Sequence, residues 1–223
     1  MEKNKKQQLH RPAHLYLEDE IYFITARTLG RHGYFIGERK KILLKSLAIA
    51  IKKYGAKIYG WVILDNHYHL LLSFRETNIR NDELNDALRR SEIRPYIFKD
   101  EFHRRLAVQF VIPKGVPRLA GFIRYIHRNS SREINKLDGT RGRQVWYQYF
   151  DRCVRDEREF YHCLGYIHNN PLKHGLSANT AELREYQFCS YGFWFQKMGR
   201  TWSEEILGLS LVQNSLIRPD EEL

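Results

Sequence analysis

The stretch Trp61-Val-Ile-Leu-Asp-Asn-His-Tyr-His-Leu-Leu-Leu72 decides the fold of this chain. Two apolar runs, one on each side of Asp65-Asn66, predict β-strands over 57–64 and 67–74. Asp and Asn are typical turn residues, so the two strands are expected to form a hairpin. This hairpin is the centre from which the remaining elements can be placed.

The rest of the chain supplies helices and strands in alternation around the hairpin. The pattern predicts, in order, a strand over Ile21–Thr28, a helix over Glu38–Tyr54, a helix over Arg118–Leu137, a strand over Val145–Val154 and a helix over Asp156–Asn170. Together with the hairpin this gives β-α-β-β-α-β-α, which is typical of an α+β, ferredoxin-like sandwich with an antiparallel sheet. Residues 180–223 are expected to add peripheral helices or loops.

Length and composition indicate one principal domain. The chain has 223 residues, of which 43% are hydrophobic, enough to bury a core of ordinary size. We expect the domain to span 15–190, with an insertion at 75–117 where charge is dense and periodicity weak. A short helix over 81–90 is predicted inside that insertion. Residues 191–223 are expected to form a C-terminal extension.

Charge and cysteine usage bear on partner and compartment. The formal net charge is +11, which favours a polyanionic partner because basic side chains release counterions from phosphates. No apolar run reaches membrane-spanning length, and the polar, basic N-terminus does not resemble a secretory signal. The three cysteines are odd in number and lack C-x-x-C spacing, so they are expected to be reduced thiols in a cytoplasmic protein.

The segment His67-Tyr68-His69 places two imidazoles on one face of a predicted strand, because side chains alternate between faces. Two adjacent imidazoles can hold one metal ion. They can equally be two hydrogen-bonded histidines on a half-buried strand. Spacing alone leaves both interpretations open.

A second segment, Tyr166-Ile-His-Asn-Asn170, puts a phenol and an amide on one face of a predicted helix. The amide oxygen could complete a metal shell, and a nearby cation would favour the nucleophilic phenolate of a group whose pKa is ordinarily near 10. Alternatively, the tyrosine packs on the core and Asn-Pro ends the helix. The segment Tyr125-Ile-His-Arg-Asn129 repeats the pattern, so the residues alone leave two candidate nucleophiles.

Both segments also carry a family resemblance. The stretches WVILDNHYHLLL (61–72) and VRDEREFYHCLGYIHNNPLKHGL (154–176) closely resemble the REP-associated tyrosine transposases, members of the single-tyrosine HUH, insertion-sequence-like superfamily. The resemblance covers roughly 15–190. It implies that His67 and His69 are metal ligands, Tyr166 the nucleophile and Asn170 the third ligand. The segment that follows Tyr166, Pro171 to Gly175, favours it over Tyr125.

The resemblance implies a reaction and a substrate. Single-stranded or hairpin DNA would be cleaved and rejoined through a 5′-phosphotyrosine with Mg²⁺ or Mn²⁺, by a homodimer or a monomer. Two other functions remain open: a non-catalytic single-stranded nucleic-acid-binding protein of ferredoxin-like fold, and a metal-dependent nuclease that uses water. Basic side chains expected to contact DNA are Lys173, Arg124, Arg128, Arg132, Arg152 and Arg155.

Overall fold

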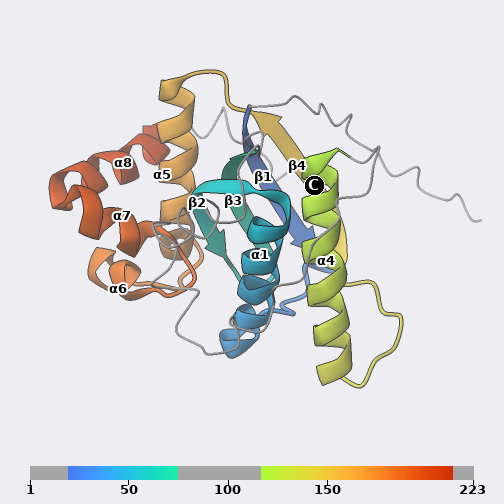
Figure 1. Cartoon of the computed structure of the whole chain (residues 1–223). Helices are drawn as coiled ribbons and strands as arrows, with labels where there is room; N and C mark the ends of the chain where they lie inside the picture. The colour runs from blue at the N-terminus through green and yellow to red at the C-terminus, as the bar shows by residue number, and fades with distance from the viewer. Residues whose placement is uncertain (1–19, 75–116, 213–223) are drawn as a thin grey trace, which may run out of the picture.

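A four-stranded antiparallel sheet is the centre of the fold (Figure 1). The computed structural model describes residues 20–74 and 117–212. The strand order is β2-β3-β1-β4, as a ferredoxin-like arrangement requires. The strands are β1 (Ile21–Thr28), β2 (Ala56–Ile63), β3 (His67–Phe74) and β4 (Trp146–Cys153).

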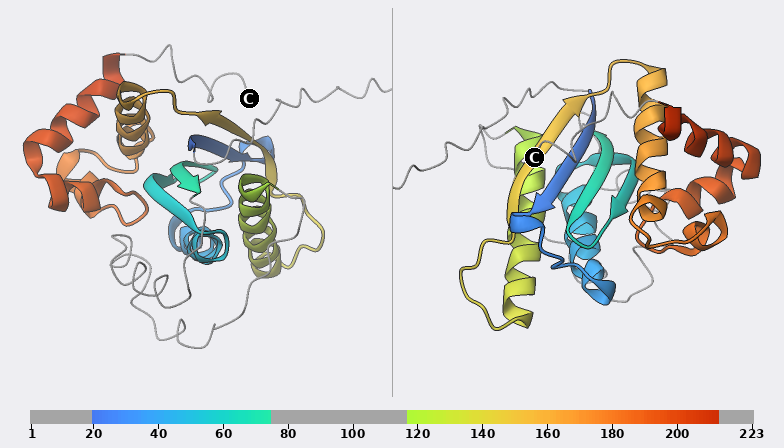
Figure 2. Two further views of the ribbon diagram at one scale, coloured as in Figure 1. Left: turned by 45° about the horizontal axis from the view of Figure 1, so that its top comes forward. Right: turned by 180° about the vertical axis from the view of Figure 1, so that it is seen from behind.

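Helices cover the two faces of the sheet unequally (Figure 2). On one face α1 (Lys40–Tyr54) and α4 (Arg118–Leu137) lie against each other and bury the larger core. On the other face α5 (Glu157–Lys173) packs against β2 and β3. The C-terminal helices are α6 (Thr180–Glu185), α7 (Tyr191–Met198) and α8 (Arg200–Val212), and α8 packs on α5.

Strict alternation along β3 divides its side chains between the two cores. Tyr68, Leu70 and Leu72 belong to the core under α1 and α4. Leu71 belongs to the core under α5, so His67 and His69 face that side as well. The antiparallel register places Thr25 of β1 opposite His69. The sheet therefore presents both imidazoles to α5.

Gly60 on β2 lets α5 approach the sheet closely. A Cβ atom built at this position would lie 2.7 Å from Cδ1 of Leu164 on α5. The β2–β3 pairing is also irregular between Ile58 and Gly60. Because glycine has no Cβ atom, Leu164 of α5 can pack against the backbone of β2 at this position without a clash. The result is a helix seated against β2 and β3.

The structure confirms the predicted fold class and element order. β1, β3 and α4 have the predicted bounds, and β2 and β4 differ from the predictions by one residue at their ends. The helix predicted from Glu38 begins at Lys40, because Gly37–Arg39 forms a 3-10 turn before it. The predicted helix over 81–90 and most of the predicted insertion lie outside the described residues.

The predicted end of α5 at Asn170 was wrong. The helix continues through Pro171 to Lys173. A proline costs only one helical hydrogen bond this close to a C-terminus, and the neighbouring bonds remain. The amide of His174 donates to the Asn170 carbonyl (2.9 Å), and Gly175, with φ of 67°, then ends the helix. Three more residues therefore extend the face that carries Tyr166 and Asn170.

The beginning of the expected C-terminal extension packs on the domain. Tyr191 of α7, with Ile206 and Leu207 of α8, is buried in the core that also contains α5. All three cysteines are free thiols, and burial raises the pKa of Cys163 to about 11 and that of Cys189 to about 12. Among the described residues no helix combines the length and apolar character needed to cross a bilayer.

Candidate active site

Two imidazoles on β3 form the floor of the candidate site. The ring centroids of His67 and His69 are 5.0 Å apart with planes at 82°, and the side chains are 8% and 0% exposed. His67 Nδ1 donates to Oδ1 of Asn66 at 2.6 Å, and His69 Nδ1 shares a hydrogen bond of 2.8 Å with the hydroxyl of Thr25. Because Nδ1 of each ring is engaged by the protein, Nε2 is the atom that each ring can offer to a metal.

Helix α5 places Tyr166 over this floor. The Tyr166 ring centroid is 5.1 Å from that of His69 and 5.9 Å from that of Phe23, edge-on in both cases. The side chain is 7% exposed. Leu164 and Ile167 beside it are fully buried and pack α5 on the sheet. The phenol is thus held against the imidazoles by the packing of its helix.

Asn170, the predicted third metal ligand, lies one helical turn after Tyr166 on α5 and is fully buried. Its Nδ2 donates to the carbonyl oxygen of Tyr166 at 2.7 Å, which fixes the orientation of the amide. Within the described residues its Oδ1 atom is buried and has no hydrogen-bond partner. A buried oxygen left in this state costs about 1–3 kcal/mol, so a ligand that binds it recovers free energy.

This donor set fits a divalent cation. Two imidazole nitrogens and one amide oxygen suit a first-row metal such as Mn²⁺, whereas Mg²⁺ prefers oxygen ligands. The described part of the chain contains no group of three or more His, Cys, Asp or Glu side chains placed to hold a metal. The fit therefore depends on Asn170 as the third donor, and its unsatisfied Oδ1 is the structural feature in favour of it.

Two basic side chains at the end of α5 border the site. Nζ of Lys173 lies 5.9 Å from the centroid of the Tyr166 ring, and its contact with a phosphate stays a prediction. The ring of His174 lies 5.0 Å from that of His67. His174 was not predicted as a site residue. Its spacing of four from Asn170 would have placed it on the same face of a longer helix.

The second candidate nucleophile lies on the opposite side of the sheet. Tyr125 projects from α4 and packs beside Tyr54, with Nζ of Lys53 at 4.8 Å from its ring centroid. Burial raises the pKa of Tyr125, which disfavours its phenolate. The structure therefore brings Tyr166, and not Tyr125, to His69.

The predicted DNA-contacting arginines fall into two groups. One group is exposed on α4, across the sheet from the histidines, and comprises Arg124, Arg128 and Arg132. Arg152 and Arg155 instead form ion pairs with Glu159, each at 3.0 Å. Burial raises the pKa of this carboxyl, but hydrogen bonds from Arg155 and the charge of Arg152 lower it overall. Contact of these five arginines with DNA stays a prediction.

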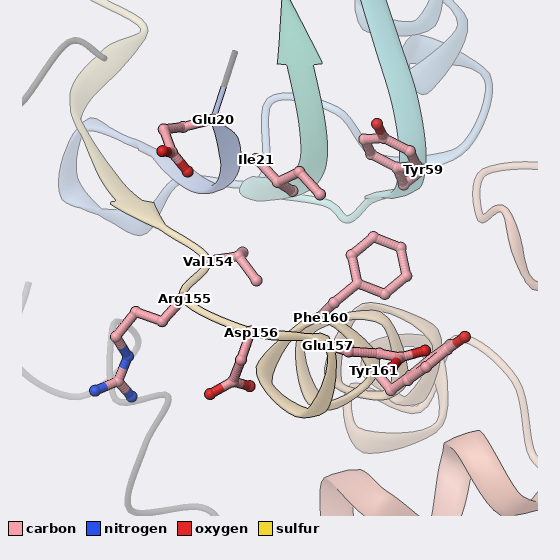
Figure 3. Close-up of a pocket in the computed structure, with 9 residues that line it drawn as sticks. All are labelled: Glu20, Ile21, Tyr59, Val154, Arg155, Asp156, Glu157, Phe160 and Tyr161. Carbon is pink, nitrogen blue, oxygen red and sulfur yellow. The ribbon is translucent and has the colours of Figure 1, made fainter. Parts of the chain in front are cut away.

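A pocket of about 510 Å³ opens at the other end of α5 (Figure 3). It is bordered by the start of β1 at Ile21 and by the aromatic rings of Tyr59 and Phe160. Ile21 precedes Thr25 by four residues, about 13 Å along the strand, so the pocket is separate from the histidine pair. The carboxylates of Asp156 and Glu157 line it and disfavour a phosphate there.

Comparisons with known proteins support the fold. No protein-family model matches the sequence, and no curated protein matches it. Among solved structures, a REP-associated tyrosine transposase bound to a REP hairpin superposes with a TM-score of 0.54 at 14% identity, covering 82% of this chain and 84% of that one. A proposed transposase from Deinococcus radiodurans R1 has a TM-score of 0.38 at 14% identity, covering 71% and 96%. The first similarity confirms the fold that the resemblance in sequence implied.

Proposed function

We propose that this protein is a single-tyrosine transposase of the REP-associated type, which cleaves and rejoins single-stranded, hairpin-forming DNA in the cytoplasm. The observation that carries the proposal is the contact between Tyr166 on α5 and His69 on β3, whose ring centroids are 5.1 Å apart. These residues are 97 positions apart in the chain. The fold shared with a REP-associated tyrosine transposase bound to a REP hairpin supports the same proposal.

The residues that would hold Mg²⁺ or Mn²⁺ are His67 and His69 through Nε2 and Asn170 through Oδ1. A cation held by these residues would polarise the scissile phosphate and neutralise part of its charge. The neighbouring hydrogen bonds to Thr25 and Asn66 keep both rings in one orientation. The two imidazole rings are therefore oriented in the absence of DNA.

Tyr166 supplies the nucleophile. Its hydroxyl loses a proton and attacks phosphorus, forming a bond between the phenolic oxygen and the phosphate. The bond to the 3′-oxygen breaks, and that oxygen takes up a proton and leaves as a 3′-hydroxyl. The 5′-phosphate stays on Tyr166, so attack by another 3′-hydroxyl reverses the reaction without ATP. The ammonium of Lys173 near the Tyr166 ring favours the phenolate and the incoming phosphate.

The test is a covalent-adduct assay with a matched pair of tyrosine variants. A 3′-labelled hairpin oligonucleotide with single-stranded flanks is incubated with the protein and Mg²⁺ or Mn²⁺ and run on a denaturing gel. The native protein should give a labelled protein band. Tyr166→Phe should lower its rate of formation by a factor of about 1,000 or more, since the nucleophile is lost. Tyr125→Phe should retain it within about twofold.

The other outcomes separate the remaining functions. Strand cleavage that survives in Tyr166→Phe indicates a nuclease that uses water. Binding of the hairpin without cleavage under either metal indicates a non-catalytic single-strand binder. Loss of the adduct in Tyr125→Phe with retention in Tyr166→Phe would keep the chemistry and overturn the assignment of the nucleophile.

A further inference from the structure

The strands beside the histidines carry a second set of side chains on the same face of the sheet. Thr25 of β1 faces the site, since its hydroxyl is bonded to His69. Phe150 of β4 lies directly opposite Thr25, and directly opposed residues share a face. Gln148 lies two positions before Phe150, where the β1–β4 register shifts between Ala26 and Thr28. The catalytic face therefore continues from the histidines onto β4.

The first half of β4 is only partly covered on this face within the described residues. Helix α5 packs against β2 and β3 and reaches β1 through the contact of Tyr166 with Phe23. No helix of residues 20–74 or 117–212 lies over the first half of β4 on that side (Figure 2, right). Tyr147, Gln148 and Phe150 are accordingly only half-buried. An aromatic ring on an open sheet offers a flat surface on which an unpaired base can stack.

Two polar side chains beside these rings have unsatisfied atoms. Within the described residues, Oε1 of Gln148 and Nε of Arg27 are buried and have no hydrogen-bond partner. Arg27 lies directly opposite His67 in the β1–β3 register, and its guanidinium lies 4.9 Å over the ring of Tyr147. If a ligand donates a hydrogen bond to Oε1 of Gln148 and accepts one from Nε of Arg27, it offsets the free-energy cost of burying these two atoms.

We propose that Phe150, Gln148 and Arg27 bind an unpaired purine next to the scissile phosphate. Phe150 stacks on the base, and Gln148 and Arg27 hydrogen-bond to its edge. Glutamine pairs with two atoms of adenine, and arginine pairs with two atoms of guanine, which is why a purine is favoured. This inference rests on the proposed function for the identity of the strand, and it assigns base selectivity to β1 and β4.

The experiment measures binding without cleavage. Full-length Tyr166→Phe protein is titrated onto a fluorescent hairpin oligonucleotide with single-stranded flanks, and each flanking purine is replaced in turn by a pyrimidine. One position should weaken binding about tenfold, the size expected for one stacked and hydrogen-bonded base. Gln148→Ala and Phe150→Leu, made in the same background, should each reduce that discrimination to about twofold or less.

Matched controls use neighbouring residues of the same kind. Gln144→Ala, in the loop before β4, and Tyr149→Phe, whose ring packs in the core under α1 and α4, should keep the full discrimination. Gln148→Glu, which adds a negative charge at the same position, should weaken binding of either base and so reports on the site even if Gln148→Ala unfolds. Thermal unfolding midpoints identify any variant that fails to fold.

The outcomes distinguish this inference from the proposed function. Full discrimination in both Gln148→Ala and Phe150→Leu, or none at any position in the parent protein, overturns the purine site. If the covalent adduct forms in the native protein while discrimination is absent, the transposase proposal stands and the purine site falls. If discrimination depends on Gln148 and Phe150 but no adduct forms, the purine site stands and the transposase proposal falls.

Discussion

Two copies of one five-residue pattern, Tyr125–Asn129 on α4 and Tyr166–Asn170 on α5, adopt nearly the same local structure. In each, the asparagine Nδ2 donates to the tyrosine carbonyl four residues before it, at 2.9 Å and 2.7 Å. In each, the central histidine bonds to a hydroxyl at 3.0 Å, from Tyr68 in one copy and Ser190 in the other. In each, a lysine ammonium lies within 6 Å of the tyrosine ring.

What differs is the face of the sheet that each copy meets. The α4 copy meets Tyr68 of β3, whereas the α5 copy meets the next residue of that strand, His69. Because side chains alternate along β3, neighbouring residues face opposite sides of the sheet. One side is an apolar core, and the other is the candidate metal site. The local pattern is therefore compatible with both roles, and the surface against which the helix packs decides between them.

The asparagine pair gives the largest expected difference. At a Mn²⁺ concentration about 100 times the dissociation constant, binding to the native state raises the free energy of unfolding by about 2.7 kcal/mol. Asn170→Ala should weaken Mn²⁺ binding by about 100-fold and remove most of that stabilisation, because a metal donor is lost. Asn129→Ala should keep it. The measurement is the thermal midpoint with and without Mn²⁺, and equal metal-induced shifts in both variants would exclude Asn170 as a ligand.

Features that depend on local periodicity could be predicted from the sequence. Features that depend on packing between distant segments could not. The strand that carries His67 and His69, and their common face, follow from a period of two. The face shared by Tyr166 and Asn170 follows from helical spacing. Which helix meets the histidines depends on packing across the sheet, so local pattern alone could not separate Tyr166 from Tyr125. The contact of His174 with His67 was not predicted, because it also joins the end of α5 to β3 across the sheet.

The histidine pair gives a smaller effect and should show the two copies behaving alike. Burial lowers the pKa of His127 and of His168 to about 3. The unfolded chain binds these protons near pH 6.5, so stability is complete above that pH and is lost as the pH falls toward 3. His127→Gln and His168→Gln should each reduce the slope of unfolding free energy against pH by about 1 kcal/mol per unit between pH 5 and 6.

Urea denaturation at several pH values measures that slope, and the slope is independent of any constant stability loss that the substitution causes. His32→Gln is the matched control, since it makes the same substitution at an exposed histidine. A slope that changes for only one of the two buried histidines would show that the copies differ in their burial as well as in their neighbours.

The lysine pair gives the smallest expected effect. Nζ of Lys173 lies 5.9 Å from the Tyr166 ring centroid, and Nζ of Lys53 lies 4.8 Å from that of Tyr125. Lys173→Gln should slow adduct formation about fivefold at low salt, because an exposed charge contributes at most about 1 kcal/mol. Lys53→Gln, although its ammonium is the nearer of the two to a tyrosine, should leave the rate within about twofold. The difference between the two variants should shrink toward 0.5 M salt, where screening shortens the range of the charge.

Two outcomes would contradict this prediction. A loss of rate in Lys173→Gln that does not depend on salt would show that the lysine acts by packing and not through its charge. An equal loss in Lys53→Gln would place the reacting phosphate on the face of the sheet that α1 and α4 cover.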